Sequence, residues 1–157
     1  MFAPVQGSEV YVFWFRRDLR LEDNRGFSVA LRAARKAGKP LIPIFIFDQD
    51  ILERLEDEDD ARVGFLYRTL AEMKAVLRKQ GSDLVILHGR PRAIWEDVAK
   101  RGLFASGENR SGGEVFLGRV VKAFANHDYE PLAIARDQRV SSVLQGCGIA
   151  FETFKDQ

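Results

Sequence analysis

The sequence predicts an α/β fold of the doubly wound, Rossmann-like class, with a five-stranded parallel sheet and helices on both faces. Segments rich in β-branched and aromatic residues recur five times, as near-continuous apolar runs typical of parallel strands buried on both faces. Stretches of helix length lie between them, as alternating strand and helix order requires. The expected strands are Val10–Phe15, Leu41–Phe47, Leu84–Leu87, Val120–Phe124 and Ile149–Phe154.

The first two helices have clear boundary signals. Asn24 is a favourable N-cap, and Gly38 followed by Pro40 predicts that this helix ends at Ala37. The second helix has apolar residues at three- and four-residue steps, which indicates one buried face, and it is expected to stop near Gly81. Its apolar positions are Val63, Leu66, Leu70, Met73 and Leu77.

Prolines mark the start of the other two helices. Pro91 suits the first turn of a third helix, and Pro131 opens a fourth that runs through Leu144. The stretch from Phe104 to Arg119, with its run of Gly, Ser and charged residues, is expected to be an irregular loop. The acidic run Glu56–Asp60 fits a solvated start of the second helix, where carboxylates compensate the helix dipole.

Composition narrows the class of protein. A chain of 157 residues with 46% hydrophobic and 30% charged positions predicts one globular domain over residues 1–157. Its net charge of +1 predicts no general electrostatic attraction to nucleic acid, although this overall charge is compatible with a local basic patch. Cys147, the only cysteine, is expected to fill the core. Apolar runs far shorter than the roughly 20 residues of a membrane span, and the lack of a secretory leader, predict a cytoplasmic protein without membrane contact.

Charged and aromatic residues directly follow three of the expected strands. They are Arg16–Asn24, Phe47–Asp50 and Asn126–Glu130. Ligands of such sheets bind outside the carboxyl ends of the strands, where the strand order reverses. We therefore expect a crevice with cations from one loop and anions from another, flanked by Phe47 and Tyr129, which suits a planar aromatic molecule with polar edges. Loop-stabilising ion pairs and helix capping are the structural alternatives for these residues.

The sequence carries none of the common catalytic or metal-binding patterns. It has no phosphate loop, no G-x-G-x-x-G after a strand and no G-x-S-x-G elbow. His88 and His127 lack metal-ligand spacing, and His88, before a tight turn, is expected to be structural. The residues by themselves thus predict a binding site without catalytic or metal-ligating groups.

Three motifs in order resemble the DNA photolyase and cryptochrome family. They are Phe13–Arg20 with Asp23-Asn24, Phe45–Asp48 with Ile51-Leu52, and Ala125–Pro131 with Ala135–Asp137. The resemblance covers only the N-terminal α/β domain of the family. It implies that the C-terminal helical domain, which binds FAD and damaged DNA, is absent from this sequence. It also implies that the chain alone is not catalytic, and that damaged DNA is a partner only through that domain.

In the family, the N-terminal domain holds an antenna chromophore that absorbs light and passes excitation energy to FAD. The resemblance therefore implies light harvesting for the repair of pyrimidine dimers by a deoxyribodipyrimidine photolyase. Folate-using relatives carry Asn-Glu where this sequence has Leu132-Ala133, which favours a deazaflavin or FMN over reduced folate. By motif matching, the chromophore-binding residues are Arg17, Ile46, Phe47, Asp48, Ile51, Leu52, Asp128 and Glu130.

Two other interpretations remain open at this point. One is a free-standing, cryptochrome-like module for light signalling or small-molecule binding, without repair activity. The other is a small doubly wound domain of the nucleotide-binding kind that holds no chromophore. If the chain is instead an antenna domain, Asp128 and Glu130 would accept hydrogen bonds from the chromophore ring, while Arg17, across the crevice, would meet its carbonyl or phosphate.

Overall fold

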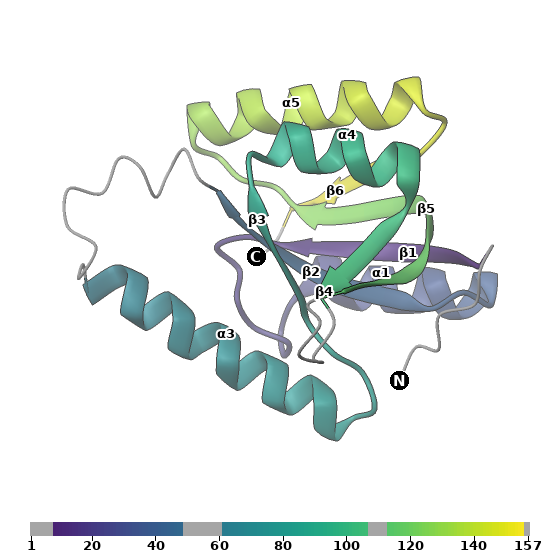
Figure 1. The fold of residues 1–157 in the computed structure, drawn as a ribbon. Helices are drawn as coiled ribbons and strands as arrows, with labels where there is room; N and C mark the ends of the chain where they lie inside the picture. Colours follow the sequence, from purple (N-terminus) through teal and green to yellow (C-terminus); the bar gives the residue numbers. More distant parts are fainter. Residues whose placement is uncertain (1–7, 49–60, 107–112, 156–157) are drawn as a thin grey trace.

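The computed structural model describes residues 8–48, 61–106 and 113–155, which form a sheet with helices on both faces (Figure 1). The central strand β1 (Glu9–Phe15) pairs in parallel with β2 (Leu41–Asp48) on one side and with β5 (Glu114–Asn126) on the other. Beyond them, β3 (Val85–Gly89) pairs in parallel with β2, and β6 (Ala150–Phe154) with β5. The five predicted strands and their parallel arrangement are confirmed.

A sixth strand lies inside the stretch that was expected to be irregular. β4 (Leu103–Ser106) pairs antiparallel with Glu114–Gly118, the first part of β5, so the prediction of a loop over 104–119 is wrong at both ends. Phe104 and Phe116 pack edge to face across this pair, with ring centroids 5.2 Å apart. These strands were not recognised beside the polar run because each paired segment has only three apolar residues, Leu103–Ala105 and Val115–Leu117. Residues 107–112 lie outside the described residues.

Within the described residues, four helices cover the two faces of the sheet (Figure 1). They are α1 (Arg25–Ala37), α3 (Ala61–Lys79), α4 (Pro91–Arg101) and α5 (Pro131–Gly146). The boundary signals of α1 are confirmed, since the Asn24 side chain accepts a hydrogen bond from the Phe27 amide at 3.0 Å and Gly38 closes the helix with φ 68°. Pro91 and Pro131 each stand in the first turn of their helix, as expected.

Alternate residues of the strands build two hydrophobic cores. Val10, Val12 and Trp14 of β1 pack in the core beneath α4 and α5, which contribute Trp95 and Val140. The intervening β1 residues belong to the opposite core, with Phe27 and Ala30 of α1 and with Leu70, Met73 and Leu77 of α3. Because both faces of β1 are buried, its sequence is a continuous apolar run without polar alternation.

The sequence also led to expectations for Cys147, for the acidic run and for membrane spans. Cys147 is exposed, so its expected place in the core is wrong: α5 buries Leu144 and ends at Gly146, which leaves Cys147 at the surface. The acidic run Glu56–Asp60 lies outside the described residues. In the part of the chain that the structure describes, no helix has both the length and the apolar character of a membrane span.

Asp83 ties the end of α3 to the start of β3. Its Oδ1 accepts a hydrogen bond from the Leu84 amide at 2.8 Å and lies 2.9 Å from Nζ of Lys74 and 3.3 Å from Nε of Arg78. Burial raises the pKa of Asp83, but these hydrogen bonds and the Lys74 charge outweigh it, so the pKa lies below the usual 3.8. The folded chain therefore stabilises the ionised carboxylate of Asp83 more than the unfolded chain does.

The lowered pKa predicts a pH-dependent contribution of Asp83 to stability. A lowered folded-state pKa stabilises above the unfolded value of 3.8, and this stabilisation is lost as pH falls through the folded value. We expect Asp83→Asn to lower the free energy of unfolding by about 1 kcal/mol at pH 7, since the group is partly exposed. Urea unfolding at pH 7 and pH 3 measures this. A difference from the parent chain that stays constant down to pH 3 would contradict the assignment.

Candidate functional site

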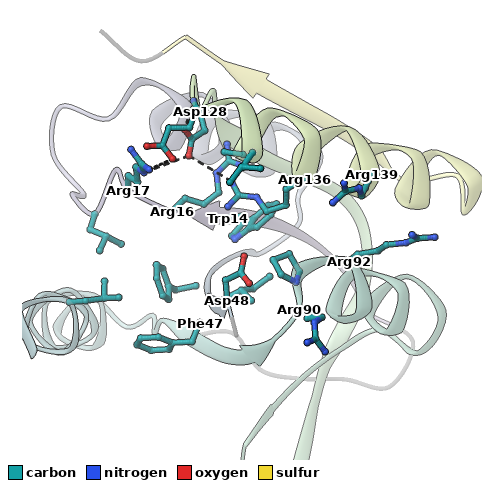
Figure 2. Close-up of a pocket in the computed structure, with 18 of the residues that line it drawn as sticks. Trp14, Arg16, Arg17, Phe47, Asp48, Arg90, Arg92, Asp128, Arg136 and Arg139 are labelled. Atoms are coloured by element: carbon teal, nitrogen blue, oxygen red, sulfur yellow. Dashed lines mark hydrogen bonds and ion pairs between the residues drawn. The ribbon is translucent and has the colours of Figure 1, made fainter. Parts of the chain in front are cut away.

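A cleft of about 720 Å³ lies at the carboxyl ends of the strands (Figure 2). Its wall is formed by the ends of β1 and β2, the first turns of α3 and α4, and the loop between β5 and α5 with the start of α5. The chain leaves β1 toward β2 and β3 on one side and later returns to β5 on the other side. The cleft thus occupies the point of strand-order reversal at which the sequence predicts a site.

Six of the eight residues predicted for the site line this cleft. They are Arg17, Ile46, Phe47, Asp48, Asp128 and Glu130. Ile51 and Leu52 lie outside the described residues. Tyr129, expected to flank the mouth, is not part of the lining; it is 64% exposed, and its ring lies beside that of His127, with centroids 6.2 Å apart.

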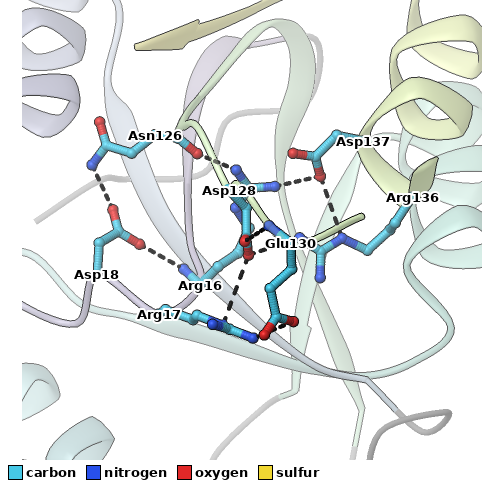
Figure 3. Close-up of polar contacts among 8 residues, drawn as sticks. All are labelled: Arg16, Arg17, Asp18, Asn126, Asp128, Glu130, Arg136 and Asp137. Atoms are coloured by element: carbon cyan, nitrogen blue, oxygen red, sulfur yellow. Dashed lines mark hydrogen bonds and ion pairs between the residues drawn. The ribbon is translucent and has the colours of Figure 1, made fainter. Parts of the chain in front are cut away.

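The Arg17 and Asp128–Glu130 loops are joined rather than held apart. Nη2 of Arg17 lies 2.5 Å from Oε2 of Glu130, and its Nε lies 3.9 Å from Oδ2 of Asp128 (Figure 3). The hydrogen bond to Glu130 raises the pKa of Arg17, and the two negative charges add to this against partial desolvation. Asp128 also accepts a hydrogen bond from the Glu130 amide at 3.1 Å. Charged residues predicted to face one another across the crevice therefore form one rim of it.

Phe47 forms a wall of the cleft and stacks against two other rings. Tyr67 of α3 stacks on it with centroids 4.8 Å apart and an interplanar angle of 26°. His88 of β3 stacks on it at 5.0 Å and 12°. Because Phe47 is 2% exposed, it shapes the cleft and offers a ligand little stacking surface. The contact gives His88 a packing role, in agreement with the structural role predicted for it.

Beneath the rim, a buried network fixes the loop that follows β1 (Figure 3). The guanidinium of Arg16 donates to the carboxylate of Asp137 and to the main-chain carbonyl of Asn126. Asp18 accepts from the Arg16 amide at 3.0 Å and from Nδ2 of Asn126 at 2.6 Å. The Arg16 guanidinium also lies over Trp14, 4.8 Å from the ring centroid. Strand β1 is thereby tied to the end of β5 and to α5, which positions the neighbouring Arg17.

Several lining residues were not predicted from the sequence. Arginines of the α4 and α5 side are one group: Arg90, Arg92, Arg136 and Arg139. The Arg136–Arg139 spacing of three residues places both on one face of a helix, but this signal gains meaning only once α5 is known to border the cleft. The other group is apolar, with Trp14 at the end of β1 and Phe65 and Leu66 on α3.

Comparisons with known proteins identify the relatives of this fold. Residues 11–104 match the family model described as DNA photolyase. The deoxyribodipyrimidine photo-lyase of Halobacterium salinarum is 33% identical over 150 residues, which cover 92% of this chain and 27% of that protein. Cryptochrome-1 of Arabidopsis thaliana is 31% identical over 149 residues, which cover 91% of this chain and 18% of that protein.

A solved structure agrees with these sequence relatives. The archaeal photolyase from Sulfolobus tokodaii, whose crystal structure holds two FAD molecules, has a TM-score of 0.67 and 30% identity. The match covers 94% of this chain and 29% of that one. The chain thus spans less than a third of the length of each of these three relatives, which are larger proteins that include this domain as one part. The family match over residues 11–104 and the shared fold show that the chain belongs to the DNA photolyase and cryptochrome family, as its N-terminal α/β domain.

Proposed function

We propose that the cleft binds a deazaflavin or a flavin, and that the chain is the antenna domain of a deoxyribodipyrimidine photolyase. The observation that carries the proposal is the cleft itself, at the strand-order reversal, with a volume of about 720 Å³ that lies within the range of small-molecule sites. A chromophore bound there supplies light absorption and passes excitation energy to FAD. The FAD and the damaged DNA belong to a helical C-terminal domain, which is the proposed partner of this chain.

The lining suits an aromatic ring system with polar edges. Phe65 of α3 and Leu132 of α5 are each 66% exposed, although both are large apolar residues at the mouth of the cleft. Leu66 and the buried Ala133 continue these apolar surfaces inward. Exposed apolar residues that border a pocket are typical of ligand sites. Light harvesting needs a firmly held π-system and no acid–base chemistry, which agrees with this lining.

The polar rim retains hydrogen-bonding capacity for a ring. Each carboxylate has about four acceptor positions, and Arg17 and the Glu130 amide use only some of those on Asp128 and Glu130. Ring N–H or hydroxyl groups are the expected donors to the rest. Leu132 and Ala133 place apolar groups where folate-using relatives carry Asn-Glu, which supports a deazaflavin or flavin over reduced folate.

A pair of matched variants tests the proposal. Phe65→Ala removes an exposed aromatic wall of the cleft, whereas Tyr129→Ala removes an equally exposed aromatic outside the lining. We expect Phe65→Ala to weaken the binding of FMN and of a deazaflavin about three- to tenfold, the value of one aromatic contact. Tyr129→Ala is expected to bind as the parent chain does. Titration of the purified chain, followed by the absorption and fluorescence of the added chromophore, measures both.

Two outcomes would count against the antenna function. One is a parent chain that takes up neither FMN nor deazaflavin, which would favour a domain without a chromophore. The other is an equal effect of the two variants, which would place the ring outside this cleft.

The similarity to cryptochrome-1 of Arabidopsis thaliana supports a second candidate, a light-signalling module without repair activity. Both candidates use the same chromophore cleft. Light-dependent reversal of pyrimidine dimers by the complete parent protein distinguishes them, because only the photolyase function includes that reaction.

A further inference from the structure

The cleft gathers positive charge in a chain that is nearly neutral overall. Among the residues that the structure describes, seven arginines line it against three carboxylates, whereas the whole chain carries a net charge of +1. The arginines are Arg16, Arg17, Arg62, Arg90, Arg92, Arg136 and Arg139, and the carboxylates are Asp48, Asp128 and Glu130. A concave site with one sign of charge concentrates ligands of the opposite sign. The local excess therefore points to an anionic ligand.

The arginines differ in how fully protein carboxylates compensate them. Arg16 is bound to Asp137, and Arg17 to Glu130, so both serve the structure of the rim. Arg136 stacks over Trp14 at 5.2 Å and its Nε lies 3.3 Å from Asp137. Its Nη2 lies 3.8 Å from Oδ2 of Asp128 and is buried without a hydrogen-bond partner in the described part of the chain.

Arg139 and Arg92 extend this basic group along the cleft. Arg139 is exposed and has no carboxylate partner within the described ranges. Among the described residues, Arg92 pairs with the exposed Glu96 one turn away, at 3.2 Å. Guanidinium donors at such positions are available to a ligand without loss of a buried ion pair.

These side chains lie together on one side of the cleft. Figure 2 shows Arg92, Arg136 and Arg139 on the side of α4 and α5, and Phe47 and Arg17 on the other. The apolar residues Phe65 and Leu66 come from α3, which packs on the opposite face of the sheet from α4 and α5. The cleft thus has an apolar end and a basic end.

We propose that Arg92, Arg136 and Arg139 form a phosphate subsite, so that the cleft selects a flavin phosphate over an uncharged flavin. This inference rests on the proposed function, because it assumes that the ring occupies the apolar end. The planar guanidinium fork matches phosphate oxygens in pairs and keeps its charge at all relevant pH values. The first turns of α4 and α5, neither of which has a side-chain cap, add partial positive charge at the same side.

The comparison of FMN with riboflavin tests this subsite directly, because the two molecules share one ring and differ in the phosphate. We expect the parent chain to bind FMN at least tenfold more tightly than riboflavin in low salt, and the preference to shrink as salt rises. Arg139→Gln and Arg136→Gln should each weaken FMN binding about tenfold and leave riboflavin binding within about twofold. Arg32→Gln, an exposed arginine of α1 outside the lining, is the matched control and should change neither.

The outcomes separate this inference from the proposed function. If FMN and riboflavin bind equally well, or if Arg139→Gln and Arg136→Gln weaken both flavins alike, the phosphate subsite is overturned while the chromophore site stands. If neither flavin binds and a deazaflavin without phosphate does, the preference for a phosphate is equally overturned. If the chain takes up no chromophore, the proposed function fails and this inference falls with it.

Discussion

Asp137→Asn should lower the free energy of unfolding by about 3 kcal/mol, within the usual cost of breaking a buried ion pair. The Arg16 side chain is 6% exposed, and its guanidinium donates to Asp137 and to the Asn126 carbonyl. Asparagine has the shape of aspartate and keeps one acceptor oxygen, but it lacks the negative charge that compensates Arg16. Since arginine does not deprotonate in proteins, its buried charge is left with less compensation. Urea unfolding followed by tryptophan fluorescence measures the loss, and Trp14 next to Arg16 is a local reporter.

The matched control is Asp97→Asn. Asp97 is also a helical aspartate paired with an arginine, at 2.6 Å from Nε of Arg101, but both side chains are 49% exposed. We expect it to cost at most about 1 kcal/mol. The double variant Arg16→Met with Asp137→Leu should recover part of the stability lost in Asp137→Asn, because two apolar groups replace two buried charges. Equal losses of unfolding free energy for Asp137→Asn and Asp97→Asn would show that burial does not make the Arg16–Asp137 pair more stabilising than the exposed pair.

The fold followed from the sequence wherever local signals agreed with the tertiary structure. Strands covered on both faces are apolar throughout, so β1 and β2 were recognisable without any knowledge of their neighbours. Asn24 and Gly38 marked the ends of α1 because capping is a local interaction. β4 was missed since its four residues are stabilised mainly by their pairing with β5, which no pattern within β4 reveals.

The site was predictable to the extent that it follows strand ends directly. Arg17, Asp48 and Asp128 come within a few residues of β1, β2 and β5, so the topology rule for parallel sheets found them. Arg139 and Phe65 lie inside helices. Their place at the cleft depends on how α5 and α3 pack on the sheet, and this packing is set by contacts far apart in the sequence.

The ion pairs within the site could not be predicted from the sequence either. Charges on two loops indicate only that they meet, and not whether a ligand or a direct ion pair joins them. The structure shows Arg17 bound to Glu130, which makes these residues one rim and leaves Arg139 as a cleft arginine without a carboxylate partner among the described residues.

Gly26→Ala should destabilise the fold by about 3 kcal/mol or more, because the first turn of α1 lies directly against the end of β5. A Cβ at Gly26 would collide with Oδ1 of Asn126, and would stand 2.9 Å from Cγ of Asn126 and 3.2 Å from the ring of Phe13. Asn126 cannot simply turn away, since its Nδ2 donates to Asp18 at 2.6 Å and to Asn24 at 2.7 Å. Either the helix shifts or these buried hydrogen bonds break, and overpacking and broken buried hydrogen bonds each cost about 1–3 kcal/mol.

Gly64→Ala in α3 is the matched control, because among the described residues its added Cβ would meet the flexible end of Arg68 alone, at 3.5 Å. There the better helix propensity of alanine should stabilise the chain by about 0.5–1 kcal/mol. Combining Gly26→Ala with Asn126→Ala should cost clearly less than the sum of the two single changes, because the second change removes the atoms that the new methyl group strikes. Additive costs in urea unfolding would show that the strain of Gly26→Ala arises elsewhere, and an unchanged midpoint for Gly26→Ala would refute the close approach of α1 to Asn126.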